Sequence, residues 1–209
     1  MDPLSMTTTT IAAVVLSSSS GLRAYLPLFA LGIAVVSGVV PLEHGYGILT
    51  NPLVLGGLGV LSVLEIVADK VPGLDHISDV VHTAVRPIMG AVIFGTTQNL
   101  VSANFGTVGA IAAPIIGGVL AGGVHGVKAL SRPVVTTTTV GIGNPIVSVI
   151  EDIATIALTV LGIIFPIVAL ILLIIMVALF VLVIRWAYRM LQRRKQQKQA
   201  KAAGTGVGG

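Results

Sequence analysis

The sequence predicts an all-α integral membrane protein, a polytopic bundle of about six membrane segments in which some helices are kinked or broken. The composition is the first reason, because 55% of the 209 residues are hydrophobic and 10% are charged, whereas soluble domains carry about 25% charged residues. The mean hydropathy of +1.02 agrees with this. The second reason is that several apolar segments are long enough to cross a hydrocarbon core of ~30 Å. The third is that the charged residues are gathered in a few short stretches.

The N-terminal part contains two elements. Residues 7–20 consist of a Thr run, a short apolar patch and a Ser run. This segment is too short to span a bilayer and is expected to be a half-helix or an interfacial piece, so residues 1–21 are treated as a segment of their own. The membrane bundle is expected over residues 22–186, and its first crossing over residues 22–40.

The middle of the chain predicts three helices. Asn51 and Pro52 supply an N-cap and an N1 proline for a helix that runs to about Lys70. The next helix is expected over residues 76–98, with a kink at Pro87. Residues 104–124 are uncharged and rich in Gly and Ala, which lets membrane helices approach closely. This segment is therefore expected in the middle of the bundle.

The last third predicts two more crossings. A loop is expected from Ser131 to Asn144, and Asn144-Pro145 then opens a helix that runs to residue 164. Residues 167–186 are the clearest single span, and residues 187–209 form a basic cytoplasmic tail with a disordered end. Residues 162–166 contain no polar side chain, so full crossing and re-entry of residues 145–165 both remain open.

The positions of the basic residues predict the orientation. Seven of the twelve Lys and Arg follow Val183, and cytoplasmic flanks are enriched in these residues. With six crossings, both termini are cytoplasmic. The loops then assigned to the outside, residues 41–51 and 99–103, contain no Lys or Arg. We therefore expect a multi-pass protein of the cell inner membrane.

A charged stretch, Glu65 to Arg86, stands out among the apolar segments. Glu65 and Asp69 are four residues apart and share one helix face. Four residues of the following helix are spaced 4, 3 and 4 and form a polar stripe: Asp75, Asp79, His82 and Arg86. The same spacing recurs in Ser148, Asp152, Thr155 and Thr159. Ionisable side chains in membrane segments are costly, so they normally face partners, a water-filled cavity or a substrate.

An internal repeat is an open alternative. Residues 17–27 and 121–133 each run from small residues through a basic group to a proline, and each precedes an Asn-Pro helix that bears acids. Repeats of this kind are typical of transporters, whose sites lie at the repeat interface.

These groups together predict a charged cavity open to the cytoplasm that binds or passes a small ion or polar solute. Passage of the solute could be linked to protons through Asp79 and His82, because a histidine that titrates near neutrality beside a carboxylate suits such coupling. Glu65 and Asp69 are expected to approach Arg23 or Arg86 across a helix interface. The predicted transport or binding residues are Arg23, Glu65, Asp69, Asp75, Asp79, His82, Arg86, Glu151 and Asp152.

Several other readings are weighed against this one. The same charges can form a structural ion-pair network, in which case the protein is a membrane scaffold or a lipid-binding partner. Arg23, Lys128 and Arg132 are expected to contact headgroups more than to form an anion site. His44 and His125 are expected to be ordinary interface residues.

Other classes of function find little support. Asp75, Asp79 and His82, with the adjacent His76, include metal-ligand types, but at most three of the four converge, and no metal or cofactor is expected. Motifs of hydrolases, phosphate loops and metalloproteases are missing from the sequence, so an enzyme is not expected. Nucleic-acid binding is not expected from the short basic tail. A homo-oligomer remains open.

Four blocks of the sequence carry a family resemblance: GLRAYLPLFALG, LEIVADKVPGLDHISDVVHTAVRPIMGA, VHGVKA and VSVIEDIATIALTVL. They resemble the successive blocks of a prokaryotic membrane family, that of domain of unknown function 4126. The resemblance covers roughly residues 15–190 and departs over residues 131–144. It implies a small polytopic inner-membrane protein and supplies no activity, substrate or site.

Overall fold

The computed structural model describes the backbone of residues 3–40, 47–71, 74–102, 106–139 and 143–204. Within these ranges the side chains of residues 3, 74–79, 99–102, 134, 138–139, 187, 190–191 and 194–204 lie outside the description. The described residues form seven α-helices and one 3-10 helix, with no strand among them: α1 Pro3–Ser20, α2 Leu26–Val36, η1 Gly47–Thr50, α3 Pro52–Ala68, α4 Leu74–Ser102, α5 Gly106–Thr139, α6 Gly143–Ile164 and α7 Pro166–Gly204.

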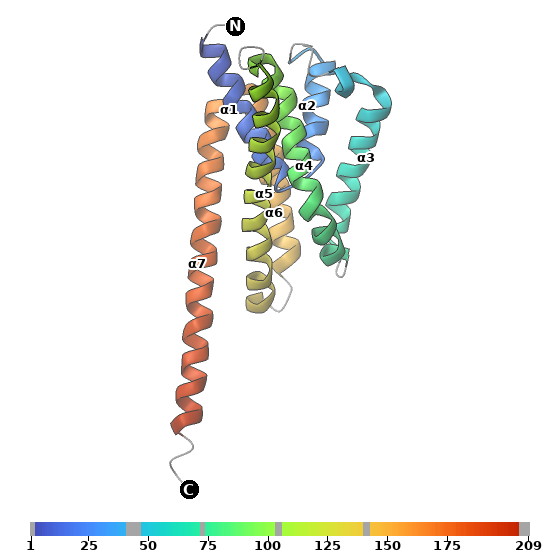
Figure 1. Ribbon diagram of the computed structural model, residues 1–209. Helices are drawn as coiled ribbons and strands as arrows, with labels where there is room; N and C mark the ends of the chain where they lie inside the picture. The colour runs from blue at the N-terminus through green and yellow to red at the C-terminus, as the bar shows by residue number, and fades with distance from the viewer. Residues whose placement is uncertain (1–2, 41–46, 72–73, 103–105, 140–142, 205–209) are drawn as a thin grey trace.

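The all-helical bundle predicted from the sequence is confirmed (Figure 1). Four of its helices contain segments long and apolar enough to cross a membrane: Val80–Gln98, Gly106–Thr137, Gly143–Ile164 and Pro166–Trp186. Two shorter helices, Leu26–Val36 and Pro52–Ala68, are also apolar. The expected number of about six membrane segments is therefore approximate.

The helices α1 and α2 form a hairpin within the bundle. In Figure 1, α1 runs from the end of the bundle where the chain begins, here called the upper end, and α2 returns toward it. The single crossing expected over residues 22–40 is thus wrong, because α2 has only 11 residues. Pro27 has no N–H to bond the Arg23 carbonyl and fits only the first turn of a new helix. The helix α1 has 18 residues, so it is longer than the half-helix or interfacial piece expected over residues 7–20.

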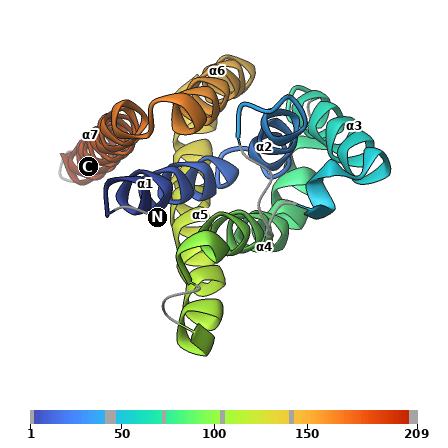
Figure 2. The same cartoon turned by 90° about the horizontal axis from the view of Figure 1, so that it is seen from above.

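The helix α1 lies among the other helices. Seen from above, it has α4 and α5 on one side and α6 and α7 on the other (Figure 2), and it contacts all four. The Ser run at its end is buried. The Ser17 hydroxyl donates to the Gly90 carbonyl of α4 over 3.1 Å, and the Ser19 hydroxyl donates to Val15 within α1. The serines therefore place polar groups inside an apolar bundle without leaving them unpaired.

The helix α3 begins as the sequence predicts. The Asn51 side chain accepts a hydrogen bond from the Leu53 N–H over 2.9 Å, and Pro52 is the first helical residue. The helix ends at Ala68, with Asp69 as its C-cap. The expected stop at residues 72–73 lies outside the described residues.

The connection between α5 and α6 differs from the expectation. Residues 131–139, predicted as part of a loop, continue α5 through Pro133. A proline removes one helical hydrogen bond, and the Thr136 hydroxyl adds a bond to the Arg132 carbonyl over 2.9 Å. The helix α7 continues through the basic tail to Gly204, and the end expected to be disordered lies, from residue 205 on, outside the described residues.

The described chain begins and ends at opposite ends of the bundle. The helix α1 begins at the upper end, and α7 ends beyond the opposite, lower end (Figure 1). The predicted placement of both termini on one side depended on six crossings. Because α1 leads away from the upper end and α2 returns toward it, these two helices together add no crossing to the count.

Small residues bring α4 and α5 together, as the Gly- and Ala-rich sequence of α5 predicts. A methyl group added to Gly117 would overlap the Gly90 carbonyl oxygen and the Phe94 side chain. The helix α5 contacts α1, α4, α6 and α7, while Val108 and Val119 on its other face are exposed. The close packing is confirmed, and one face of α5 remains on the outside of the bundle.

We predict that Gly117→Ala destabilises the protein, although alanine is the better helix former. The added methyl forces α4 and α5 apart, and overpacking of this kind costs about 1–3 kcal/mol. Gly123→Ala on the same helix is the matched control, because no atom lies within 4 Å of its added methyl. Thermal unfolding in detergent should show a lower melting temperature for Gly117→Ala alone. Equal melting temperatures would contradict the close packing.

Candidate functional site

The turn between α1 and α2 is surrounded by ionisable side chains from four other helices. They come from the end of α3, the first half of α4, the second half of α5 and the first turns of α6. We call them the charged cluster: Arg23, Glu65, Asp69, Lys70, His82, Arg86, His125, Lys128, Arg132, Glu151 and Asp152. These residues are joined by the ion pairs and hydrogen bonds described below.

Glu65 of α3 faces the first residues of the second hairpin arm. Its carboxylate accepts the Ala24 N–H over 2.8 and 3.0 Å and the Tyr25 N–H over 3.4 Å. The same carboxylate lies 3.3 Å from Arg86 Nη2 and 3.6 Å from His82 Nε2. Free N–H groups at a helix start favour negative charge. Glu65 therefore caps α2 and links it to α4.

Asp69 joins three basic side chains. Its Oδ2 lies 2.5 Å from Arg23 Nη1, 3.1 Å from Arg132 Nη2 and 3.4 Å from Lys128 Nζ. Lys128 also donates to the Leu22 carbonyl over 3.0 Å. The α1–α2 turn is thereby tied to α3 and to α5.

The acids of α6 complete the cluster. Glu151 Oε2 lies 2.9 Å from Lys128 Nζ, and Asp152 lies 2.5 Å from Arg23 Nη2 and 2.6 Å from Lys70 Nζ. Arg23 also donates to the Ser148 hydroxyl over 2.9 Å. The predicted polar stripe of α6, Ser148, Asp152, Thr155 and Thr159, is buried along its whole length.

The contact between Arg86 and His125 defines the protonation of the histidine. Arg86 Nη1 lies 2.6 Å from His125 Nδ1. Because arginine only donates and does not lose its charge in proteins, Nδ1 must accept. The ring proton is then on Nε2, which lies 3.2 Å from the Thr83 hydroxyl and donates to it. His125 is therefore neutral in this arrangement.

Burial falls from the centre of the cluster toward the lower end. The side chains of Arg23, Arg86 and Lys128 are at most 1% exposed. Those of Arg132 and Lys70 are 14% and 35% exposed. Since removing one partner of a buried pair leaves an uncompensated charge, the inner pairs hold the helices in register.

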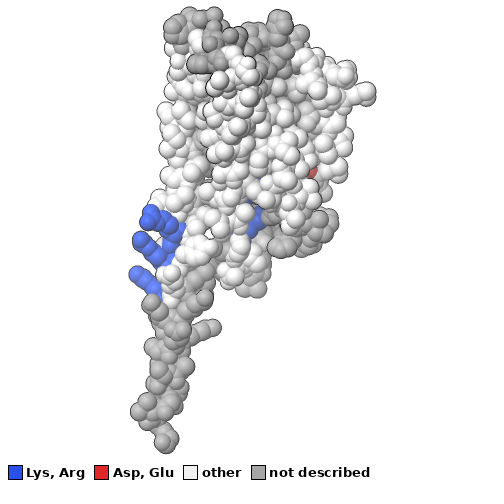
Figure 3. Space-filling model, in the orientation of Figure 1, with Lys and Arg blue, Asp and Glu red and all other residues white. Residues whose placement is uncertain are grey.

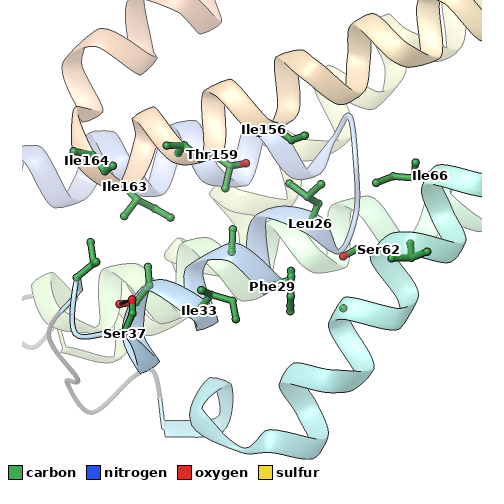
Figure 4. A pocket seen from close by; sticks show the side chains of 16 residues that line it. Leu26, Phe29, Ile33, Ser37, Ser62, Ile66, Ile156, Thr159, Ile163 and Ile164 are labelled. Atoms are coloured by element: carbon green, nitrogen blue, oxygen red, sulfur yellow. Dashed lines mark hydrogen bonds between the residues drawn. The ribbon is translucent and has the colours of Figure 1, made fainter.

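A large cavity, here called the apolar groove, lies beside the charged cluster. It has a volume of about 560 Å³, lies between α2, α3 and α6, and contains no charged residue in its lining (Figure 4). The predicted site was a cavity lined by charges. In this structure the charged side chains instead contact one another directly.

The structure brings together seven of the nine predicted site residues: Arg23, Glu65, Asp69, His82, Arg86, Glu151 and Asp152. The predicted approach of Asp69 to Arg23 and of Glu65 to Arg86 is confirmed. The side chains of Asp75 and Asp79 lie outside the described residues, as does that of His76. In the part of the chain that is described, no three metal-ligand side chains gather closely enough to hold a metal ion.

Four members of the cluster were not among the predicted site residues: Lys70, His125, Lys128 and Arg132. The headgroup reading of Lys128 and the interface reading of His125 are wrong, since both are buried in the cluster. Their spacing carried the signal, because His125, Lys128 and Arg132 are 3 and 4 residues apart and share one helix face.

A bundle of apolar, membrane-length helices around a buried cluster of ion pairs defines a polytopic integral membrane protein. More specifically, the chain belongs to the family of the domain of unknown function DUF4126, whose model matches residues 10–186. The resemblance read from the sequence is thereby confirmed. No curated protein and no solved structure matches the chain.

We predict that Lys128→Met strongly destabilises the fold. The substitution leaves Glu151 with only the longer 4.0 Å contact to Arg132 and removes one of the cations of Asp69. Loss of one partner of such a buried pair costs about 3–5 kcal/mol. The double variant Lys128→Met/Glu151→Gln should recover part of this loss, because the amide carries no charge. Thermal unfolding in detergent measures both effects.

Arg185→Met is the control for Lys128→Met, because Arg185 is exposed on α7. It should unfold at the temperature of the unaltered protein. A Lys128→Met protein as stable as this control would mean that the inner ion pairs do not hold the bundle.

Proposed function

We propose that this integral membrane protein binds a small ion or polar solute at the break between α1 and α2 and passes it toward the lower end. One observation carries the proposal: the Glu65 carboxylate lies at the start of the half-length helix α2 and also contacts Arg86 and His82. Broken helices whose ends face a mid-membrane site are a recurring feature of transporters. The proposal assigns no catalytic residue and no cofactor.

The contacts of Glu65 suggest how the site opens. The backbone N–H groups of Ala24 and Tyr25 and the Arg86 guanidinium form a site that favours negative charge, here called the Glu65 seat. The Glu65 carboxylate fills this site in the present arrangement. A proton on Glu65 would remove the charge that holds it there. His82 lies 3.6 Å away and packs edge-on against the Tyr25 ring, so it is the nearest described group able to exchange that proton.

The partial exposure of the outer pairs suggests the route. Lys70, Arg132 and Asp152 keep contact with solvent while the inner residues do not. A solute released from the Glu65 seat would meet these groups next. Rearrangement of the outer pairs therefore opens the site toward the lower end.

A second candidate is a scaffold or lipid-binding membrane protein whose charges are structural. The observation in its favour is the direct pairing of the cluster: Arg23, Lys128 and Arg86 are almost wholly buried and each contacts a carboxylate. A dry, paired network fixes helix registry without moving a solute. Measured flux separates the two candidates.

The distribution of basic residues supports an orientation. Arg185, Arg189 and Arg193 lie on α7 at the lower end, where Figure 3 shows Lys and Arg atoms below an almost uncharged face. Cytoplasmic flanks are enriched in such residues. The lower end is therefore assigned to the cytoplasm of a prokaryotic inner membrane, and the start of α1 to the opposite side.

We predict that Arg86→Gln leaves a folded protein with at least tenfold lower flux. Glu65 keeps its two backbone N–H donors in this variant, so the fold survives while the charge of the seat is lost. Arg86→Lys should keep part of the flux, because it retains the charge and loses the two-pronged geometry. Proteoliposomes loaded with a panel of ions and polar metabolites provide the measurement.

Arg185→Gln serves as the control for flux, because this arginine is exposed. The scaffold candidate gives a different pattern. Arg86→Gln would then lose expression and thermal stability, the double variant Arg86→Gln/Glu65→Gln would restore both, and no solute of the panel would cross with any variant.

We predict that Leu4 and Ile48 face one side of the membrane and Arg193 the other. The chain contains no cysteine, so single cysteines at these three exposed positions report their side through an impermeant thiol reagent. Leu4→Cys and Ile48→Cys should label together and Arg193→Cys separately. Labelling of Leu4→Cys from the side of Arg193→Cys would restore an even number of crossings.

A further inference from the structure

The Glu65 seat binds both oxygens of the carboxylate that fills it. The Ala24 N–H lies 3.0 Å from Glu65 Oε1 and 2.8 Å from Oε2, so this donor is shared between the two oxygens. The Tyr25 N–H adds a contact to Oε2 over 3.4 Å, and Arg86 Nη2 adds a contact to Oε1 over 3.3 Å. Donors thus face each oxygen of a planar group. This geometry recognises an anion with two acceptor oxygens.

The seat is more than the start of a helix, because side chains of two other helices complete it. The Arg86 side chain of α4 is 0% exposed and the Glu65 side chain of α3 is 1% exposed. Arg86 is also held by His125 of α5, whose Nδ1 accepts from Arg86 Nη1. An arginine at this depth keeps its charge. The seat therefore stays positive when the Glu65 carboxylate leaves it, and a buried positive site requires an anion.

We propose that the solute of this site is a small monocarboxylate anion, which takes the place of the Glu65 carboxylate together with one proton. The inference rests on the proposed function and names its solute. Acetate has the same atoms as the end of a glutamate side chain, so it matches the donors that Glu65 vacates. The proton binds to the Glu65 carboxylate, and no bond of the solute is made or broken.

The cost of buried charge links the anion to the proton. If Glu65 stayed ionised, an entering anion would add a negative charge at membrane depth. If Glu65 took a proton and the seat stayed empty, the guanidinium of Arg86 would lose the charge that Glu65 supplies. When both bind, the seat holds one carboxylate before and after the exchange. The proton and the anion therefore bind together, one for one.

Space for the displaced Glu65 side chain lies close by. Ser62, three residues earlier on the same face of α3, and Ile66, the next residue, both line the apolar groove. A neutral carboxyl group is far less costly in apolar surroundings than a carboxylate. Protonation thus both releases Glu65 from the seat and allows its side chain to turn away.

Other classes of solute fit the seat less well. A cation would be repelled by the guanidinium, and a neutral solute would leave the positive charge of the seat uncompensated. A chloride ion has the right charge but offers no second oxygen to the donors that now contact Glu65. A monocarboxylate satisfies both the charge and the two-oxygen geometry.

The test measures binding of acetate to the full-length protein in detergent, through the rise of its melting temperature with sodium acetate. Since one proton enters with each anion, the apparent dissociation constant should rise about tenfold per pH unit wherever the free Glu65 is ionised. Sodium chloride at equal concentration should bind at least tenfold more weakly.

Two substitutions assign the proton to Glu65. The charged and titratable side chains described around it are Arg23, Tyr25, Asp69, His82 and Arg86. All of them remain in Glu65→Gln, which is neutral at every pH, so acetate should raise its melting temperature with a dissociation constant that no longer depends on pH. A pH dependence that persists in this variant would overturn the proposal.

Glu151→Gln is the matched control. It also removes a buried carboxylate beside a cation, Lys128, but no backbone N–H among the described residues bonds the Glu151 oxygens. Acetate should leave the melting temperature of this variant unchanged. An equal rise in Glu151→Gln and Glu65→Gln would overturn the assignment to the seat.

The pH dependence in the unaltered protein does not require Glu65→Gln to fold. No binding of acetate, binding without pH dependence, or an equal effect of chloride would each overturn the proposal. Flux of another ion in proteoliposomes without such acetate binding would overturn this inference and leave the proposed passage standing. Acetate binding with the expected pH dependence, but without flux of any solute, would support the anion site and overturn the proposed passage.

Discussion

The cost of charge inside a membrane is the constraint on which the rest of this structure depends. An arginine cannot escape that cost by losing its proton, so it must be paired or hydrated. Arg23 lies in the turn of the α1–α2 hairpin and meets Asp69 and Asp152 from two different helices. Its pairing therefore fixes where α3 and α6 lie relative to the hairpin. The same argument applies to Lys128, which joins α5 to Asp69 and Glu151.

The two halves of the chain that suggested an internal repeat interlock through these pairs. The acids of α3 contact bases of α5, and the acids of α6 contact Arg23 of the first half as well as Lys128 of the second. The local structures differ, because Arg23 follows the end of α1 while Lys128 lies within the continuous helix α5. In both halves, basic side chains pair with acids on neighbouring helices. These ion pairs join five helices at one level of the bundle.

The apolar groove and the charged cluster are neighbours along the same helices. Ile66 of the groove follows Glu65 of the cluster, and Leu26 follows Tyr25, whose N–H bonds Glu65. The short helix α2 thus contacts the cluster at its start and forms a groove wall along its length. A change in the charge of Glu65 would therefore act on a helix that also lines the groove.

The sequence by itself determined the helical class, most helix starts and the faces that bear charge. Asn51-Pro52 starts a helix through local capping, and the spacing of Ser148, Asp152, Thr155 and Thr159 defines a buried face, since both depend on neighbours along the chain. Tertiary structure decided the rest. The hairpin of α1 and α2 depends on Gly21 packing against α5, and His125 belongs to the cluster because of its contact with Arg86, 39 residues away. Sequence spacing shows which residues share a helix face, but only the packing of the helices shows which faces meet.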